Sequence, residues 1–281
     1  MAVERMAIGV MLGVGEAPEE SLRKVLDVGV TNAQMGRPPD AWLKPAKAAE
    51  LKKMIKRSGV TITTVFCGFD GESYADIPTV RATVGLVPKA TRAARLKKAK
   101  QIADFAKILG VKNVAAHVGF VPEDPADPDY KEIVRTVRAF ADYLARNKQN
   151  LCLETGQETG ECLLRFIQDL GRRNVKVNFD PANMILYGSG EPIPALRLVG
   201  KYVAGVHCKD GIWPTEKDKL GFEVPLGKGK VNIPRFIQTL ADLGYKGPLT
   251  IEREITGDEQ KKDIVKARKL LERIRAKVLA K

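Results

Sequence analysis

Four segments of the sequence end on side chains that could together bind a metal ion. Apolar runs close on a carboxylate or an imidazole at Leu-Cys-Leu-Glu154, Val-Asn-Phe-Asp180, Gly-Val-His207 and Thr-Ile-Glu252. Each residue could separately cap its strand or pair with a nearby Lys or Arg. Three carboxylates gathered together, however, repel one another unless a cation neutralises them. We therefore predict one divalent metal ion. The oxygen-rich set suits manganese best, with magnesium, cobalt or zinc as alternatives.

The elements that would hold these residues alternate along the whole chain. Short β-rich apolar runs predict strands at 7–11, 31–35, 60–67, 113–118, 151–155, 175–180, 203–207 and 249–252. Amphipathic patterns predict helices near 19–28, 42–57, 91–109, 129–147, 161–170, 191–199, 232–243 and 258–279. Eight strand–helix units with short helix-to-strand turns favour a closed parallel barrel. We predict an α/β fold, with a single (β/α)8 TIM barrel domain over residues 1–281.

A barrel of this kind would bring the four side chains to one place. They lie at the ends of four consecutive predicted strands, and such barrels place their active sites at the C-terminal ends of the strands. Long strand-to-helix loops are predicted on the same face, at 68–90, 118–128 and 208–231. His117, one of only two histidines, closes the fourth predicted strand. It could be a hydrogen-bonded core residue, but its position favours a substrate contact.

Five segments in this order, LETGQET, NFDPANM, GVHCKDG, PLGKGKVN and LTIERE, resemble the sugar-phosphate isomerase/epimerase family. Its members are xylose-isomerase-like TIM barrels related to ketose 3-epimerases, inosose dehydratases and endonuclease IV. The resemblance implies that Glu154, Asp180, His207 and Glu252 match the metal ligands of the family. It also implies that Glu154 and Glu252 are catalytic acid/base groups on opposite faces of the substrate. A homodimer or homotetramer is implied as well.

Three further residues are candidate substrate contacts. Lys209 matches a lysine of the family and could orient a hydroxyl, bind a phosphate or pair with a metal-site carboxylate. Asn183 stands where many epimerases have a histidine, and its amide can hydrogen-bond a hydroxyl but cannot act as an imidazole acid. Glu158 could reach the substrate from the loop after the fifth strand, or it could be a solvated charge at a helix start.

These features indicate a metal-dependent isomerase or epimerase of a sugar, keto-sugar or sugar phosphate, acting by proton transfer next to a carbonyl. A dehydratase of a keto-polyol is an alternative, because the same enediolate can lose a β-hydroxyl. A dinuclear isomerase would use Glu254 or Asp210 at a second ion. An endonuclease IV-like enzyme would need more than two histidines for its three-zinc cluster, so nucleic acid is not an expected partner. A non-catalytic sugar-binding barrel would not need all four ligands.

The composition limits the remaining interpretations. Apolar residues make up 44% and charged residues 29% of the chain, as in soluble globular proteins. No apolar run reaches the roughly 18 residues needed to span a bilayer. The four cysteines form no C-x-x-C pair and are expected to be free thiols in a reducing cytoplasm. The net charge of +13 includes basic runs at 92–100 and 261–281, expected to be solvated helix faces. Attraction of a phosphorylated substrate or nucleic acid is the alternative.

Overall fold

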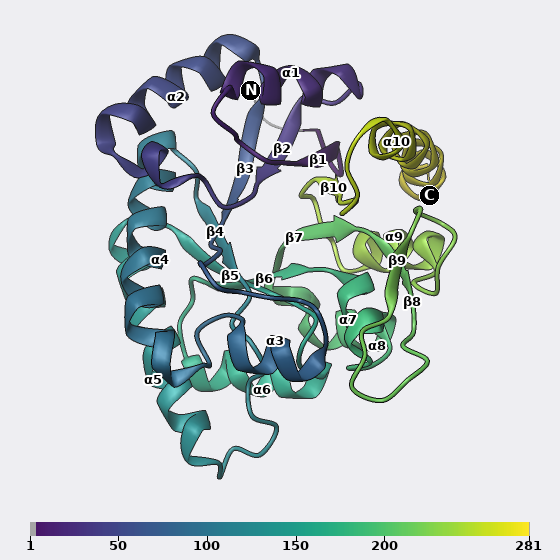
Figure 1. Cartoon of the computed structure of the whole chain (residues 1–281). Coiled ribbons are helices and arrows are strands. Elements are labelled where there is room, and N and C mark those ends of the chain that lie inside the picture. Colours follow the sequence, from purple (N-terminus) through teal and green to yellow (C-terminus); the bar gives the residue numbers. More distant parts are fainter. Residues whose placement is uncertain (1–3, 281) are drawn as a thin grey trace.

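Eight parallel strands close into a barrel at the centre of the computed structural model, which describes residues 4–280 (Figure 1). Neighbouring strands follow the order β1-β10-β7-β6-β5-β4-β3-β2. The barrel strands are Ile8–Leu12 (β1), Asn32–Met35 (β2), Thr61–Phe66 (β3), Asn113–Ala116 (β4), Asn150–Glu154 (β5), Val175–Phe179 (β6), Val203–Cys208 (β7) and Leu249–Ile251 (β10). Each overlaps one predicted strand, and the predicted TIM barrel is confirmed.

Within residues 4–280, ten α-helices and two short 3-10 helices lie between the strands or after the last one. The α-helices are Pro18–Asp27 (α1), Pro45–Ser58 (α2), Ile77–Thr83 (α3), Lys89–Leu109 (α4), Pro128–Arg146 (α5), Gly160–Leu170 (α6), Pro181–Tyr187 (α7), Pro192–Val199 (α8), Ile233–Asp242 (α9) and Asp258–Leu279 (α10). The 3-10 helices are Asp40–Leu43 (η1) and Gly200–Tyr202 (η2). Several α-helices carry proline in their first turn, where its missing N–H leaves no hydrogen bond unmade.

Parts of the connections after three barrel strands are folded where no element is predicted. The helices α3 and α7 have seven residues each, which is too short for a clear helical period. The strands Asp210–Ile212 (β8) and Phe222–Val224 (β9) form an antiparallel hairpin outside the barrel. These elements follow β3, β6 and β7, so they build the face at which the barrel strands end.

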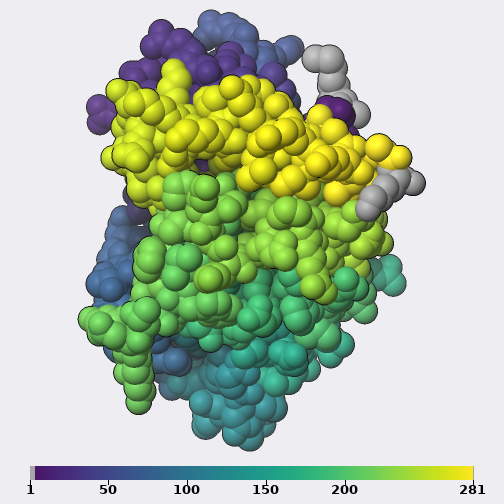
Figure 2. Space-filling view, turned by 90° about the vertical axis from the view of Figure 1, so that its right-hand side faces the viewer, coloured from purple at the N-terminus to yellow at the C-terminus, as the bar shows by residue number. Residues whose placement is uncertain are grey.

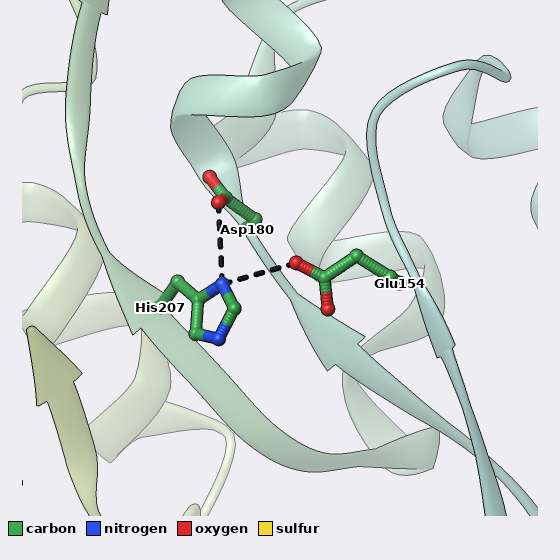
Figure 3. Close-up of side chains that lie close together, drawn as sticks. All are labelled: Glu154, Asp180 and His207. Atoms are coloured by element: carbon green, nitrogen blue, oxygen red, sulfur yellow. Dashed lines mark hydrogen bonds and ion pairs between the residues drawn. The ribbon is translucent and has the colours of Figure 1, made fainter. Parts of the chain in front are cut away.

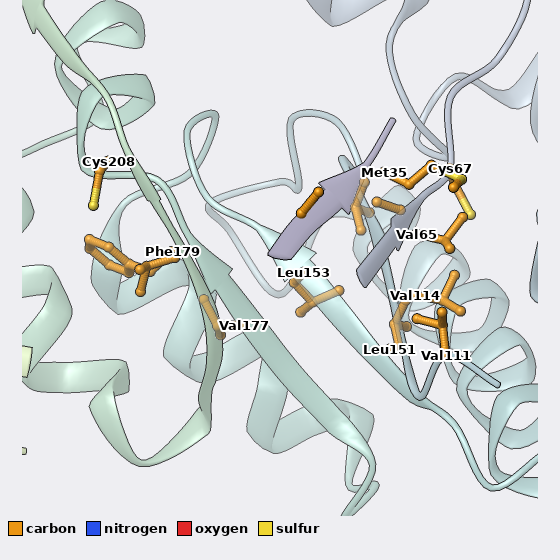
Figure 4. Close-up of a cluster of buried hydrophobic side chains, with 14 of the residues drawn as sticks. Met35, Val65, Cys67, Val111, Val114, Leu151, Leu153, Val177, Phe179 and Cys208 are labelled. Atoms are coloured by element: carbon orange, nitrogen blue, oxygen red, sulfur yellow. The ribbon is translucent and has the colours of Figure 1, made fainter. Parts of the chain in front are cut away.

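Alternate residues of each barrel strand face opposite sides of the sheet. In β5, Leu151 and Leu153 belong to the large core between strands and helices (Figure 4). Cys152 belongs instead to a separate small cluster that includes Phe66. Glu154 has the same parity as Cys152 and therefore faces the barrel interior. This is the orientation that a common metal site at the strand ends requires.

The basic run in α4 differs from the prediction of a solvated helix face. Arg92 and Arg95 are only 8% and 5% exposed. Nε of Arg92 donates to the Leu86 carbonyl at 2.8 Å, and a terminal nitrogen of Arg95 donates to the Gly85 carbonyl at 2.8 Å. A guanidinium can be buried here because loop carbonyls accept its hydrogen bonds. The two arginines thus fix the loop between β3 and α4.

The second basic run forms α10, which lies across the face shown in Figure 2, between N-terminal segments in purple and segments in green. Only one side of this helix is buried, through Asp263, Ile264, Ala267 and Leu271. Lys261 pairs with Asp27 at 3.4 Å, and both side chains stay about half exposed. The described part of this run is therefore a largely solvated helix face, as predicted.

Two further predictions, on the cysteines and on membrane-spanning segments, can be compared with the structure. All four cysteines are free and buried. Among the helices of residues 4–280, none is both long and apolar enough to cross a membrane.

Candidate metal centre

Glu154, Asp180 and His207 point toward one another where their strands end (Figure 3). Glu154 is the last residue of β5, Asp180 directly follows β6, and His207 lies near the end of β7. Oε1 of Glu154 and Oδ2 of Asp180 lie 3.0 and 3.3 Å from Nδ1 of His207. One candidate ligand atom of each residue lies within 4.8 Å of the others. Three of the four predicted ligands therefore form one compact, buried cluster.

Glu252 joins this cluster from the neighbouring strand. It directly follows β10, which pairs with β7, and its Oε2 lies 3.2 Å from Nδ1 of His207. Three carboxylate oxygens thus face one imidazole nitrogen. A nitrogen lone pair would be repelled by these oxygens unless a proton or another cation lay among them. The donor set therefore fits a divalent ion, which would take the place of that proton.

Two cationic groups balance the buried carboxylates. Burial alone would lower the pKa of His207, but the carboxylates of Glu154 and Glu252, with a hydrogen bond to Asp180, raise it well above its usual value. Burial alone would raise the pKa of Glu252, but attraction to His207 and Lys209 takes it well below its usual value. Glu252 is therefore ionised at neutral pH.

Lys209 pairs with carboxylates at this site. Its Nζ lies 2.9 Å from Oε1 of Glu254 and 3.2 Å from Oε2 of Glu252, and it donates to Oδ1 of Asn183 at 3.2 Å. Burial alone would lower the pKa of Lys209, but Glu252, Asp180 and Glu254 raise it well above its usual value. Of the roles left open by the sequence, the structure shows the ion pair with a carboxylate of the candidate metal site.

A cavity of about 450 Å³ opens beside the cluster, within the usual range for small-molecule sites. Glu154, His207 and Glu252 line it, together with two predicted substrate contacts, His117 and Asn183. The remaining lining residues are aromatic, aliphatic or acidic: Phe66, Tyr74, Leu186, Tyr187, Leu220, Gly221, Glu223 and Glu254. The ring of His117 packs edge-on to Tyr74, with 6.1 Å between ring centroids.

Glu158 is buried, which excludes a solvated charge at the start of α6. Its side chain is one of the buried polar groups, and the residue is 7% exposed. Burial, reinforced by repulsion from Glu123 and Glu154, raises its pKa to about 8. Glu158 is therefore mainly a neutral acid at pH 7, able to donate a hydrogen bond. It does not belong to the cavity lining described above, so substrate contact by Glu158 stays a prediction.

Asp210 holds the loop that carries the β8–β9 hairpin. Its carboxylate accepts four backbone hydrogen bonds of 2.9 to 3.1 Å, from the amides of Gly211, Gly227, Gly229 and Val231. These bonds use the oxygen lone pairs that a second metal ion would need. The other candidate for a second ion, Glu254, is paired with Lys209. The geometry thus favours a single ion.

Comparison with known proteins gives the family. A family model described as a xylose isomerase-like TIM barrel matches residues 22–274. The chain belongs to this family. A curated relative from Methanocaldococcus jannaschii, the uncharacterized protein MJ1311, is 25% identical over 181 residues, which span 60% of this chain and 59% of that protein.

Solved structures match this xylose isomerase-like barrel over nearly its whole length. A xylose isomerase domain protein from Planctomyces limnophilus matches with a TM-score of 0.92 and 41% identity over 100% of both chains. A D-tagatose 3-epimerase-like protein has a TM-score of 0.76 and 17% identity, covering 97% of this chain and 99% of its own. A xylose isomerase-like TIM barrel protein from Mycobacterium smegmatis, in complex with magnesium, has a TM-score of 0.70 and 19% identity, covering 99% and 98%. The last two identities are low and show a shared fold alone.

Two residues around the candidate metal centre of this xylose isomerase-like barrel are not among those that the sequence predicts. Gln34 in β2 is 1% exposed and its Oε1 lies 2.9 Å from Nε2 of His207. Asn178 in β6 is fully buried and donates to Oε2 of Glu154 at 2.7 Å. A signal is present in the sequence, since Asn178 precedes Asp180 by two positions and so has the same parity in its strand.

Proposed function

We propose that the protein is a divalent-metal-dependent isomerase or epimerase of a sugar. The observation that carries the proposal is the pair of carboxylates, Glu154 and Glu252, that line one cavity and both face His207. They come from β5 and from the end of β10, which lie on opposite sides of β7 in the barrel. Two acid/base groups at one cavity are what removal and return of a proton require.

The metal would be held by Glu154, Asp180, His207 and Glu252, with manganese as the first candidate and magnesium next. A bound divalent ion would supply Lewis-acid polarisation of a substrate carbonyl. One glutamate would take a proton from the carbon next to the carbonyl, and the low pKa of Glu252 keeps it ionised for this role. The other would return a proton, either to the opposite face, which gives an epimer, or to the neighbouring carbon, which gives an isomer.

Within the sugars, the cavity favours a neutral substrate over a phosphorylated one. Four of its lining residues are glutamates: Glu154, Glu223, Glu252 and Glu254. Their field would repel a phosphate dianion. Two cations beside these glutamates are already paired: Lys209 with Glu252 and Glu254, and Arg253 with Glu223. A polyhydroxylated molecule has both polar edges and C–H faces. Its hydroxyls could hydrogen-bond to the amide of Asn183 and the imidazole of His117, and its C–H faces could pack on the aromatic rings of the lining.

A solvent-exchange experiment tests this proposal. Ketohexoses, pentuloses, inososes and their phosphates are incubated in heavy water with manganese- or magnesium-loaded protein, and deuterium is followed by NMR after the metal is removed. We expect deuterium at the carbon next to the carbonyl of a neutral sugar. Glu154→Gln and Glu252→Gln should abolish the exchange, and Glu161→Gln, at an exposed position in α6, should leave it unchanged. Metal-loaded protein without exchange on any substrate would overturn the proposal.

A further inference from the structure

We propose that Gln34 and Asn178 are positioning residues that fix the tautomer of His207, so that Nδ1 is presented to the metal. The inference rests on the proposed metal site, but it concerns how this chain prepares the ligand rather than the reaction. Metal-binding histidines need one ring nitrogen with a free lone pair, and a partner of the other nitrogen decides which one that is.

A continuous chain of hydrogen bonds runs from Glu154 to His207 through the barrel interior. Nδ2 of Asn178 donates to Oε2 of Glu154 at 2.7 Å, and Nε2 of Gln34 donates to Oδ1 of Asn178 at 3.0 Å. Oε1 of Gln34 then lies 2.9 Å from Nε2 of His207. Because β2 and β6 lie on opposite sides of the barrel, Gln34 reaches across its interior.

The direction of every bond in this chain follows from its carboxylate end. A carboxylate that binds a metal ion only accepts hydrogen bonds, so Asn178 turns its NH2 group toward Glu154. The Asn178 oxygen then faces Gln34, which must turn its own NH2 group toward that oxygen. This leaves the Gln34 oxygen facing His207, so Nε2 of the ring must carry a hydrogen. In a neutral imidazole the lone pair is then on Nδ1, the nitrogen that faces the three carboxylates.

The packing around the two amides supports a fixed arrangement. Gln34, Asn178, Glu154 and His207 are all 2% exposed or less, so water does not compete for these bonds. Gly205 in β7 provides the space that the amides occupy. A Cβ at this position would lie 2.3 Å from Oδ1 of Asn178 and 3.1 Å from Nε2 of Gln34. Any larger residue at 205 would therefore displace the amide pair.

The ring of His207 is also held from one side. Phe66 stacks on it with ring centroids 5.4 Å apart and an interplanar angle of 26°. Stacking limits rotation of the ring, but it does not distinguish the two nitrogens. The Gln34 oxygen does, and Gln34 is therefore the residue whose replacement should change the tautomer.

Two readouts test the proposal without any measurement of activity. The first is the Mn²⁺ affinity of purified full-length protein, measured by titration. Replacement of a hydrogen-bond partner of a metal ligand typically costs about 10- to 100-fold in affinity. We expect a loss of this size for Gln34→Met. Gln34→Glu should stay closer to the wild type, because one oxygen of the new carboxyl group, when protonated, can still accept from Nε2 while the other donates to Oδ1 of Asn178. Asn32→Ala is the matched control, since it removes a buried amide of the same strand that donates instead to the Ile8 carbonyl.

The second readout is the ring-nitrogen NMR spectrum of the magnesium-loaded wild type. The chain has only two histidines, and a His117→Gln variant assigns the remaining one. We expect a hydrogen on Nε2 of His207. A hydrogen on Nδ1 would overturn the proposal even if Gln34→Met failed to fold. Equal Mn²⁺ affinity of wild type and Gln34→Met would overturn it as well. Strong metal binding without solvent exchange on any sugar would instead refute the proposed function and leave this inference standing.

Discussion

Replacement of Glu158 by glutamine tests whether this buried side chain after β5 stays protonated at neutral pH. The pKa of Glu158 is raised from its ordinary 4.5 to about 8, because burial penalises the charged form. The folded protein therefore keeps a proton between these values, whereas the unfolded chain releases it. Stability is fully present below pH 4.5 and is lost progressively as the pH rises toward 8. Glutamine has nearly the same shape but does not titrate.

The size of the effect follows from the two pKa values. One pH unit corresponds to about 1.4 kcal/mol, so the wild type loses about 3 kcal/mol relative to Glu158→Gln between pH 5 and pH 7.5. For domains of similar size this corresponds to roughly 6–12 °C in melting temperature. Thermal unfolding of both proteins at the two pH values measures it. The control is Glu161→Gln, since Glu161 is an exposed neighbour in the first turn of α6.

An equal stability difference between Glu158→Gln and the wild type at pH 5 and pH 7.5 would contradict the raised pKa of Glu158. A gain for the wild type as the pH rises would refute it more strongly, because it would mean that the folded protein prefers the ionised carboxylate. A confirmed effect would show that Glu158 is a protonated acid at neutral pH, able to donate a proton.

Three further outcomes are expected. Lys209→Met should destabilise the metal-free protein by about 1.5–3 kcal/mol in denaturant unfolding, because the largely buried Glu252 carboxylate loses a charge-assisted hydrogen bond and keeps His207 as a cationic partner; an unchanged midpoint would contradict this. Asp210→Ala should loosen the β8–β9 hairpin, because four backbone amides lose their acceptor, and limited proteolysis should then cut within residues 211–231 while the wild type resists. Chelation of metal from loaded protein should lower the melting temperature, and Mn²⁺ at 100 times its dissociation constant should restore about 2.7 kcal/mol; an Mn²⁺-independent melting temperature would count against the site.

The candidate ligands at the strand ends could be predicted from the sequence, because each is marked by a pattern of a few neighbouring residues. Each predicted ligand closes a short apolar run, and the regular alternation of strands and helices indicates that these runs lie side by side. Glu154, Asp180, His207 and Glu252 could therefore be grouped without knowledge of any distance. The same reasoning identified His117, and the family resemblance identified Asn183; both residues line the cavity.

Other features depend on contacts that the sequence does not reveal. Gln34 and Asn178 are 144 positions apart and meet only because the barrel closes. Arg92 belongs to a basic helical run, and nothing in the run itself shows that loop carbonyls bury it. Lys209 could have faced the substrate, and its pairing with Glu254 depends on the path of the chain after β10. Short elements such as α7 and β8 have too few residues to show a period.

The most direct test of the account is the stoichiometry of Mn²⁺ binding in the wild type and in Asp180→Asn. Asn is as good a helix N-cap as Asp, so this variant should keep the cap that Asp180 gives α7 while losing a negatively charged ligand. Asp76→Asn is the matched control, since Asp76 caps α3 in the same way and is neither a predicted ligand nor part of the cavity lining. We expect one tightly bound ion per chain in the wild type and in the control, and a large loss of affinity in Asp180→Asn. Absence of binding in the wild type, or equal binding by all three proteins, would contradict a metal centre built from these strand ends.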